Sequence, residues 1–331
     1  MTQAHPFAEI WRGDILESVH AGHAVLCDDT GQIVEAWGDP TRVILPRSSA
    51  KMLQALPLIE SGAADAHNLT TEQLALACAS HNGAAIHTTR VAQWLSDLAL
   101  GEPDLRCGTH DPMGKEDNYA LLRAHEAPCQ LHNNCSGKHA GFLTLNKHIG
   151  GGAEYVDPSH PIQIAIKQAF EEVTGEDSPG FGIDGCSAPN FATTLHGMGR
   201  AMAAFASADD STTRGRAMTR LWQAMIAHPA LVAGEPRACT QLMRATSEPV
   251  ALKTGAEGFF IAILPQRKMG IALKAACGTT RAAECAIAAL LVKLGALDPN
   301  HPATKTFMTP EIKNANGWTT GYMRPAPELL A

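Results

Sequence analysis

A serine and a lysine stand three residues apart in the segment RSSAKM, at Ser48 and Lys51. The mostly apolar run after them predicts a helix that ends near Gly62, and residues at i and i+3 of a helix lie on one face. A serine hydroxyl is a poor nucleophile until a neighbouring base takes its proton, and a neutral lysine amine can be that base. Alone, such a pair is more often a helix cap followed by a solvated charge.

Two other segments combine polar side chains with permissive backbone. KTGAEG, which begins at Lys253, leads out of a predicted strand, and its first glycine lets a ligand approach the main chain closely. ASHNG places Ser80 and Asn82 where a helix ends and a turn begins. Each segment alone is weak evidence, because ordinary strands and turns contain both patterns.

The elements that must position these groups follow from periodicity and from Gly and Pro boundaries. Thr70 and Gln73 form a capping-box pattern at the start of one helix. Short apolar or alternating runs predict strands at 21–29, 31–38, 249–255, 258–265 and 269–277. Helical apolar spacing predicts helices at 48–62, 70–80, 84–100, 137–150, 161–175, 189–207, 212–228 and 279–297. The tail, 314–331, is expected to be irregular.

This order of strands, helices, strands and a last helix predicts an α/β (α+β) fold. The two strand groups are expected to join into one antiparallel sheet, formed by about 1–62 and 249–331 and flanked by helices. A mostly helical insert, about 63–248, completes a single catalytic unit. Strands and helices do not alternate, which argues against Rossmann and TIM-barrel folds.

Composition excludes several classes of partner. The 331 residues carry a net charge of −7, which argues against nucleic-acid binding. No run of about 18 apolar residues is present, and the first residues do not resemble a signal peptide, so no membrane partner is expected. Nine irregularly spaced cysteines without a Cys-x-x-Cys pair predict a cytoplasmic protein with reduced thiols.

Taken together, Ser-x-x-Lys, Ser-x-Asn and Lys-Thr-Gly in this chain order resemble the serine β-lactamases and penicillin-binding proteins, and the expected fold is β-lactamase-like. SHN replaces the usual Ser-Asp-Asn, and Ser48 lies close in sequence to Ser80. These departures indicate that the chain shares the architecture of these enzymes but is not a β-lactamase. Two alternative functions remain. The chain could be an acyl hydrolase that acts on a β-lactam or a peptide, or a non-catalytic relative that binds an amino acid.

Longer stretches resemble the rhizobial-type, or thermolabile, L-asparaginases (the asparaginase II family) over nearly the whole chain. They are LPRSSAKMLQALPLIESG, ASHNG, NNCSGKHAGFL (133–143), GIDGCSAPNF (182–191) and LKTGAEGFF (252–260). The Thr-Gly-Gly-Thr-Ile motif of classical bacterial asparaginases is absent, and nothing marks the autocleaved threonine of the plant type. The resemblance implies an amidohydrolase that converts L-asparagine to L-aspartate and ammonia, and a homodimer.

The resemblance also implies two Ser–Lys pairs, Ser48 with Lys51 and Ser80 with Lys253. Ser48 would form the acyl-enzyme, and Ser80 could relay a proton between the two amines. Making a lysine neutral at pH 7 costs roughly 4 kcal/mol from an ordinary pKa near 10.4, and burial or a second cation supplies that shift. Ser49 is the competing serine, but it lies off the face that carries Lys51.

Substrate contacts are expected from charge matching. Arg47 would hold the α-carboxylate, and Asp184 and Glu257 would hold the α-ammonium. Asn82 and Thr254 would fix the amide, and backbone N–H groups of Ser48 and Ala256 would form the oxyanion hole. The candidate substrate-binding residues are Arg47, Asn82, Asp184, Thr254, Gly255, Ala256 and Glu257. Each side chain could equally serve a structural hydrogen bond.

A metal site is implied by the same resemblance. Cys135 and Lys138 stand at i and i+3 of a predicted helix start, and Cys186 comes from a separate segment. Thiolates bind zinc well, whereas a lysine amine is an unusual ligand. From the residues alone, buried inert cysteines would be the commoner reading. The family resemblance predicts one Zn²⁺ on Cys135, Lys138 and Cys186, tuning the site without attacking the substrate.

Overall fold

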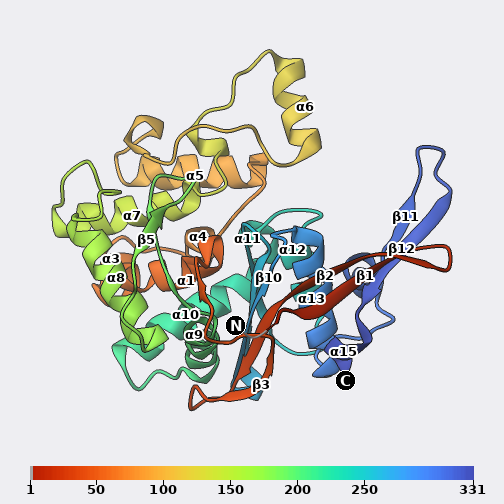
Figure 1. The fold of residues 1–331 in the computed structure, drawn as a ribbon. Coiled ribbons are helices and arrows are strands. Elements are labelled where there is room, and N and C mark those ends of the chain that lie inside the picture. Colours follow the sequence, from red (N-terminus) through yellow and green to blue (C-terminus); the bar gives the residue numbers. More distant parts are fainter. Residues whose placement is uncertain (1–2) are drawn as a thin grey trace. The chain divides into compact units, whose positions relative to one another are not determined.

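The computed structural model describes residues 3–331, and the chain forms two compact units. Figure 1 shows the helices and strands. Unit 1 comprises residues 3–49, 194–207 and 241–331, and unit 2 comprises 50–193 and 208–240. The observed division departs from the predicted boundaries near 62 and 248 in two places. Residues 50–62 belong to unit 2, where their helices pack against other helices, and residues 194–207 belong to unit 1, where they pack on its sheet.

Unit 1 contains an eight-stranded sheet in which every neighbouring pair is antiparallel. The order is β11-β12-β1-β2-β10-β9-β8, and β3 also pairs with β2. The strands are β1 (His5–Arg12), β2 (Ile15–Cys27), β3 (Ile33–Trp37), β8 (Ala251–Gly255), β9 (Phe259–Leu264), β10 (Met269–Ala275), β11 (Glu311–Lys313) and β12 (Thr319–Pro325). The pairing of β2 with β10 joins the two predicted strand groups, so that prediction is confirmed.

Two long helices cover the central strands, α9 (Leu195–Ser207) and α13 (Thr280–Lys293). Every residue of β9 is buried, which requires cover on both faces because successive side chains point to opposite faces. Helix α9 crosses β10 closely enough that a Cβ on Gly270 would lie 2.2 Å from the Ala203 nitrogen. The glycine therefore allows the helix backbone to reach the strand.

The ends of the chain depart from the predictions. The tail was expected to be irregular, and this is wrong: β12 pairs with β1, a strand that was also not predicted. Ala8, Ile10 and Met323 from these strands pack with Cys285 of α13 in one buried cluster. Both strands contain Pro and polar residues, so neither displays clear alternation, and each depends on a partner about 310 positions away in sequence.

Unit 2 is mostly helical, as predicted. Its helices are α1 (Lys51–Gln54), α2 (Leu56–Glu60), α3 (Ala63–Ala66), α4 (Thr71–Ala77), α5 (Ala85–Asp97), α6 (Lys115–Ala124), α7 (Ser136–Ile149), α8 (Pro161–Thr174), α10 (Thr213–Ala227) and α11 (Pro229–Val232). A short hairpin joins β5 (Phe181–Ile183) to β6 (Pro189–Phe191). The capping box of Thr70 and Gln73 at the start of α4 is confirmed. The fold class, an antiparallel sheet with helices and a mostly helical insert, is likewise confirmed.

Several shorter elements complete the chain. They are β4 (Val43–Ile44), η1 (Arg47–Ala50), η2 (Glu102–Asp104), η3 (Gln130–His132), β7 (Thr193–Thr194), α12 (Ala238–Ala245), η4 (Pro265–Arg267), α14 (Pro302–Met308) and α15 (Pro327–Leu330). The helix predicted from residue 48 is a 3-10 turn, η1, followed directly by α1 and α2. The helix predicted from 189 begins only at Leu195, after β6 and β7. None of the helices in the described part of the chain has the length and apolar character that crossing a membrane requires.

Candidate active site

The predicted nucleophile lies in the 3-10 turn η1, at the end of the N-terminal segment of unit 1. Lys51 lies outside this turn, as the first residue of α1. Arg47 adopts a left-handed conformation, with φ of 52°, which is uncommon outside glycine. Ser48 is half-buried. The choice of Ser48 as nucleophile, and its pairing with Lys51, stay predictions.

Ser49 has a different environment, because it is 0% exposed. Its hydroxyl donates to the backbone carbonyl of Lys253 at 2.9 Å. Gly255 lies against the same turn: a Cβ there would sit 2.6 Å from the Pro46 carbonyl oxygen and 3.0 Å from Ser49 Oγ. The Lys-Thr-Gly segment therefore contacts the turn that carries Ser48 and Ser49.

Lys253 is buried within β8, and its amine donates to the Thr254 carbonyl at 2.8 Å. Beyond Gly255 the chain turns at Ala256 and Glu257, which are exposed. Glu257 has a φ of 60°, a second non-glycine residue in the left-handed region. Strained backbone of this kind often marks functional turns.

Lys274 holds this turn and was not among the predicted residues. Its amine, on β10, donates to the Glu257 carbonyl oxygen. Burial lowers the pKa of Lys274, and the positive charges of Arg42 and Arg47 add to that effect. The cationic character of this part of unit 1 suits a carboxylate ligand, but only tertiary pairing of β10 with β9 brings Lys274 to it.

In unit 2, the Lys51 side chain is buried at the start of α1. Its amine lies 3.1 Å from Ser80 Oγ and 3.1 Å from Cys135 Sγ, and it also donates to the Ala79 carbonyl. The structure thus brings together a predicted base, a predicted relay serine and a predicted metal ligand. The partnership of Ser80 with Lys253 joins residues of the two units and stays a prediction.

The loop after α4 fixes Ser80 through its backbone. The Ser80 N–H donates to the Val232 carbonyl at 2.9 Å, and the Arg237 guanidinium donates to the Ser80 carbonyl at 3.1 Å. The Asn82 amide donates to the Glu235 carbonyl at 2.7 Å. Arg237 and Glu235 were missed, because the sequence around them gives no motif. Asn82 has a structural bond, and its predicted substrate contact stays untested.

The predicted metal ligands also lie together in unit 2. Lys138 Nζ is 2.9 Å from Cys186 Sγ, and the thiols of Cys135 and Cys186 share a hydrogen bond. All three side chains are buried. Cys135 precedes α7 directly, Lys138 lies in its first turn, and Cys186 comes from the β5–β6 turn, as the sequence suggested.

Charges in this cluster are strongly coupled. The hydrogen bond from Cys135, followed by the charge of Lys138, lowers the pKa of Cys186 well below its usual range, whereas the pKa of Cys135 rises. Burial alone would lower the pKa of Lys138, but the sulfurs and the Asp184 carboxylate outweigh it and raise the pKa. These directions favour a negative Cys186 sulfur beside a positive Lys138 amine, and Asp184 is close enough to contribute.

Two buried histidines flank these groups. His81 Nε2 lies 3.0 Å from Ser136 Oγ, so it ties the Ser80 loop to the start of α7. Its Nδ1 accepts the Gly83 N–H at 3.1 Å. Burial lowers the pKa of His81 well below its usual value, and burial also lowers that of His139. Both rings are therefore neutral near pH 7.

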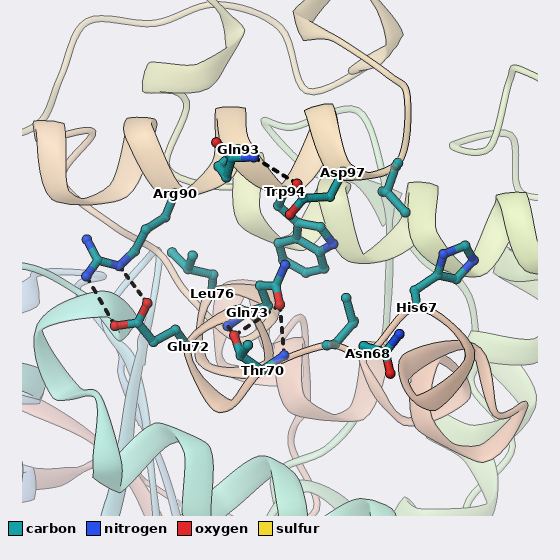
Figure 2. A pocket seen from close by; sticks show the side chains of 12 residues that line it. His67, Asn68, Thr70, Glu72, Gln73, Leu76, Arg90, Gln93, Trp94 and Asp97 are labelled. Atoms are coloured by element: carbon teal, nitrogen blue, oxygen red, sulfur yellow. Dashed lines mark hydrogen bonds and ion pairs between the residues drawn. The ribbon is translucent and has the colours of Figure 1, made fainter.

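One hollow of unit 2 lies apart from these residues. It measures about 380 Å³ and runs between the start of α4 and α5 (Figure 2). Its polar side chains already pair with one another: Arg90 with Glu72 at 2.9 Å, and Gln93 with Asp97 at 2.8 Å. No predicted catalytic, substrate-binding or metal-binding residue lines it, so it offers no alternative to the predicted site.

Comparison with solved structures gives distant similarities. They include a β-lactamase from Mycobacterium bovis (TM-score 0.41, 14% identity, 79% of this chain and 89% of that chain) and a D-alanine carboxypeptidase from Burkholderia cenocepacia (0.37, 14%, 79% and 91%). A penicillin-binding protein homologue from Pyrococcus abyssi is also similar (0.38, 11%, 84% and 74%). No curated protein sequence matches the chain.

A family model gives the assignment. The model described as L-asparaginase II matches residues 8–325, and this range contains all the predicted site residues. The expected resemblance to asparaginase II enzymes is thereby confirmed. Because the match leaves only the two ends of the chain outside it, the chain belongs to the L-asparaginase II family.

Proposed function

We propose that the protein is an L-asparaginase that hydrolyses the side-chain amide of L-asparagine to L-aspartate and ammonia. The observation that carries the proposal is the buried Lys51 amine, 3.1 Å from Ser80 Oγ and three residues after Ser48, in a chain of the L-asparaginase II family. Ser–Lys acyl transfer needs a lysine amine that can take a proton from a serine hydroxyl, and the Lys51 amine contacts the hydroxyl of Ser80.

In the first half of the reaction, Ser48 Oγ attacks the amide carbon while its proton passes to Lys51. The oxygen of the tetrahedral intermediate is negative, and the backbone N–H groups of Ser48 and Ala256 would stabilise it. The carbon–nitrogen bond then breaks, and the nitrogen takes a proton to leave as ammonia. Ser80, in contact with the Lys51 amine, is a suitable donor or relay for that proton.

In the second half, water attacks the ester carbonyl and gives up a proton to the same basic group. The bond between the acyl carbon and Ser48 Oγ breaks, the serine regains its hydrogen, and aspartate is released. The same residues serve both halves because deacylation repeats acylation with water in place of the serine. Lys253 is proposed as the partner of Ser80 in these transfers.

The α-carboxylate and the α-ammonium of the substrate would each be held by side chains of opposite charge. Arg47 and Lys274 are cations suited to the α-carboxylate. Asp184 and Glu257 are candidates for the α-ammonium. Thr254, Gly255 and Asn82 are candidates for the amide end, where a small backbone lets the ligand come close. The family resemblance adds a homodimer as an expectation, and the irregularly spaced cysteines add a cytoplasmic location.

Zinc is proposed as the resident metal. Among residues 3–331, no three His, Cys, Asp or Glu side chains gather closely enough for a metal ion, and the proposed site has the Lys138 amine as its third ligand. Two sulfurs and an amine are donors that zinc accepts, and the Lys138 amine lies 2.9 Å from Cys186 Sγ; it would lose its proton on binding the metal. Bound zinc would supply positive charge that tunes nearby groups, and Cys135, Lys138 and Cys186 would hold it.

The test is ammonia release from L-asparagine by the purified protein, with the Ser48→Ala variant as control. Active wild type and an inactive, folded Ser48→Ala variant are expected. An electrophilic asparagine analogue should add its mass to the peptide that contains Ser48. A chromogenic β-lactam tested in parallel distinguishes the alternative acyl hydrolase. Undiminished ammonia release by Ser48→Ala would remove the proposed nucleophile.

A further inference from the structure

Arg237 is a cation of unit 2 that has no role in the proposed reaction. It lies between α11 and α12 and is half-buried. Its guanidinium donates from Nη1 to the Ser80 carbonyl at 3.1 Å and to the Met113 sulfur at 4.0 Å. In the described part of the chain no carboxylate pairs with it, and Nε and Nη2 have no hydrogen-bond partner. These two nitrogens form the edge of a guanidinium that binds a carboxylate bidentately.

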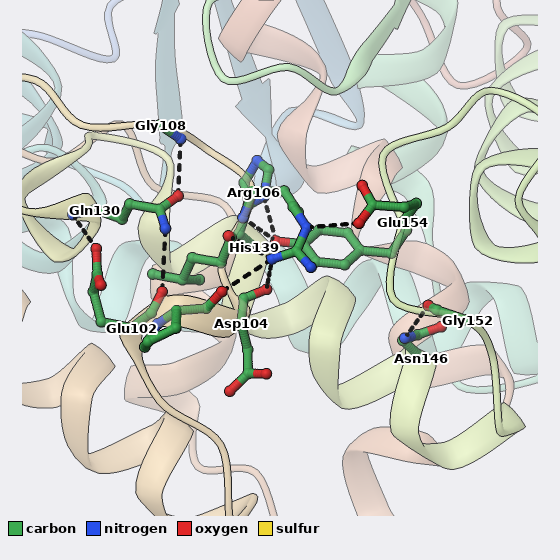
Figure 3. A network of polar contacts seen from close by, with 12 residues as sticks. Glu102, Asp104, Arg106, Gly108, Gln130, His139, Asn146, Gly152 and Glu154 are labelled. Atoms are coloured by element: carbon green, nitrogen blue, oxygen red, sulfur yellow. Dashed lines mark hydrogen bonds and ion pairs between the residues drawn. The ribbon is translucent and has the colours of Figure 1, made fainter.

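Arg106 shows how a structural arginine of the same unit is satisfied. Its Nη1 donates to three backbone carbonyls, and its Nε donates to the Glu154 carboxylate at 3.2 Å (Figure 3). The Nε edge of Arg106 is therefore already paired with a carboxylate, whereas that of Arg237 has no such partner among residues 3–331. A charge that is partly removed from water is costly without an opposite charge, so an anionic ligand would be stabilised at Arg237.

A closed ring of contacts joins Arg237 to the proposed base. The Lys51 amine contacts Ser80 Oγ at 3.1 Å and the Asn134 carbonyl at 3.5 Å. The Asn134 side-chain amide donates to Met113 Sδ at 3.5 Å, and Arg237 closes the ring between Met113 and the Ser80 carbonyl. Lys51 and Ser80 are buried, whereas Met113 is 53% exposed. The ring therefore runs from the proposed reacting groups to the surface of unit 2.

The substrate itself limits where its carboxylate can be recognised. In asparagine three bonds separate the amide carbon from the carboxylate carbon, so the two atoms are at most about 4 Å apart. A cation that recognises the carboxylate must therefore stand next to the groups that act on the amide. Arg237 meets this requirement, because it contacts Ser80, whose hydroxyl contacts the Lys51 amine.

We propose that Arg237 binds the carboxylate of the substrate through its Nε and Nη2 edge, and that it selects amides with a carboxylate three bonds from the reacting carbon. It adds a cation of unit 2 to Arg47 and Lys274 of unit 1. The inference rests on the proposed function. A purely structural arginine would only hold the Ser80 carbonyl, and its loss would slow the reaction of every amide alike.

The first test compares two amides. β-Alaninamide is asparagine with a hydrogen in place of the α-carboxylate, so it keeps the amine and the reacting amide. In Arg237→Gln, KM for L-asparagine should rise about 10–100-fold, the usual effect of losing a hydrogen bond to a charged group, with kcat little changed. The kcat/KM for β-alaninamide should equal that of the wild type. Arg237→Lys keeps the charge without the fork, so its KM should be intermediate. Arg123→Gln, at an exposed arginine of α6, is the matched control and should behave as the wild type.

The second test measures binding without turnover, and it decides the inference if β-alaninamide reacts too slowly to measure. Calorimetry should show that Arg237→Gln binds the product L-aspartate about 10–100-fold more weakly than the wild type, and that Arg237→Lys restores part of the affinity.

Two results overturn the inference alone. One is an unchanged KM and L-aspartate affinity in folded Arg237→Gln, and the other is an equal loss of kcat/KM for both amides. If the wild type releases no ammonia from L-asparagine, the proposed function fails, but weaker L-aspartate binding by Arg237→Gln would still support the carboxylate site. A wild type that neither releases ammonia nor binds L-aspartate overturns both.

Discussion

At the scale of single residues, the Lys51 amine connects two kinds of chemistry. The amine has contacts to the Ala79 carbonyl, Ser80 Oγ and Cys135 Sγ. A change at the proposed metal ligand Cys135 can therefore affect Ser80 through the Lys51 side chain. This arrangement gives the proposed zinc a physical route to influence the reaction without touching the substrate.

Substitutions at the two adjacent serines should have different effects, one on stability and the other on turnover. Ser49→Ala removes the donor to the Lys253 carbonyl, and a buried unpaired carbonyl costs about 1–3 kcal/mol. We expect that loss in the free energy of unfolding, with turnover retained in the folded protein. Ser48→Ala should reduce ammonia release by about 10³-fold or more while stability changes little. Urea denaturation and an ammonia assay measure both, and the reverse pattern would assign the nucleophile to Ser49.

Gly255 should tolerate no side chain. A Cβ at this position would meet the Pro46 carbonyl oxygen at 2.6 Å, and backbone cannot move aside as a flexible side chain can. We expect Gly255→Ala to lose about 1–3 kcal/mol of unfolding free energy and most of the activity. Gly152→Ala is the control, since nothing lies within 4 Å of its Cβ. Equal stability of the two variants in urea would contradict the close contact.

The sequence was most informative where chemistry and backbone requirements coincide. Lys253 and Gly255 could be proposed as site residues because an amine and an unobstructed backbone occur together in a known motif, and Ser48 because of its spacing to Lys51. Lys274 and Arg237 could not, since each reaches its partner only through tertiary structure. Arg237 lies 157 positions from Ser80, in the segment between α11 and α12.

At the scale of elements, local signals were reliable for strands with strong apolar character. β8, β9 and β10 are buried at nearly every position and were predicted from composition alone. β1 and β12 belong to the outer part of the sheet, where exposed positions weaken the alternation. Ala8, Ile10 and Met323 pack with Cys285 of α13, far away in the sequence, so no short window of the sequence could reveal their burial.

The capping box of α4 offers a test at this scale. Thr70 Oγ1 accepts the Gln73 N–H, and the Gln73 side chain accepts the Thr70 N–H at 2.8 Å. Thr70→Ala removes one of these bonds and should cost about 1 kcal/mol of unfolding free energy. Thr70→Ser keeps the oxygen and should cost less. Because the cap and Ser80 lie at opposite ends of α4, turnover of folded Thr70→Ala should stay near wild type, and a large loss would indicate that the cap also orders the Ser80 loop.

At the scale of the molecule, unit 2 encloses three neutral histidines. Burial lowers the pKa of His81, His87 and His139, and the rings of His81 and His87 stack with centroids 4.7 Å apart. A second charge in that stack would add repulsion to the cost of burial. These rings therefore resist protonation in the folded state, although each would titrate near pH 6.5 in an unfolded chain.

This difference predicts that unit 2 loses stability in mild acid. A folded pKa below the unfolded one means that the unfolded chain binds more protons, so the free energy of unfolding falls as pH drops below about 6.5. Each such histidine contributes at most about 1.4 kcal/mol per pH unit in that range. We expect urea midpoints to fall clearly between pH 7.5 and 5.5.

His87→Gln removes one titrating ring, whose Nε2 contacts the Ala230 carbonyl, and should flatten the pH dependence while costing some stability at pH 7.5. His125→Gln, at an exposed histidine, should leave the pH dependence unchanged. An identical slope in His87→Gln would mean that the acid sensitivity comes from other groups.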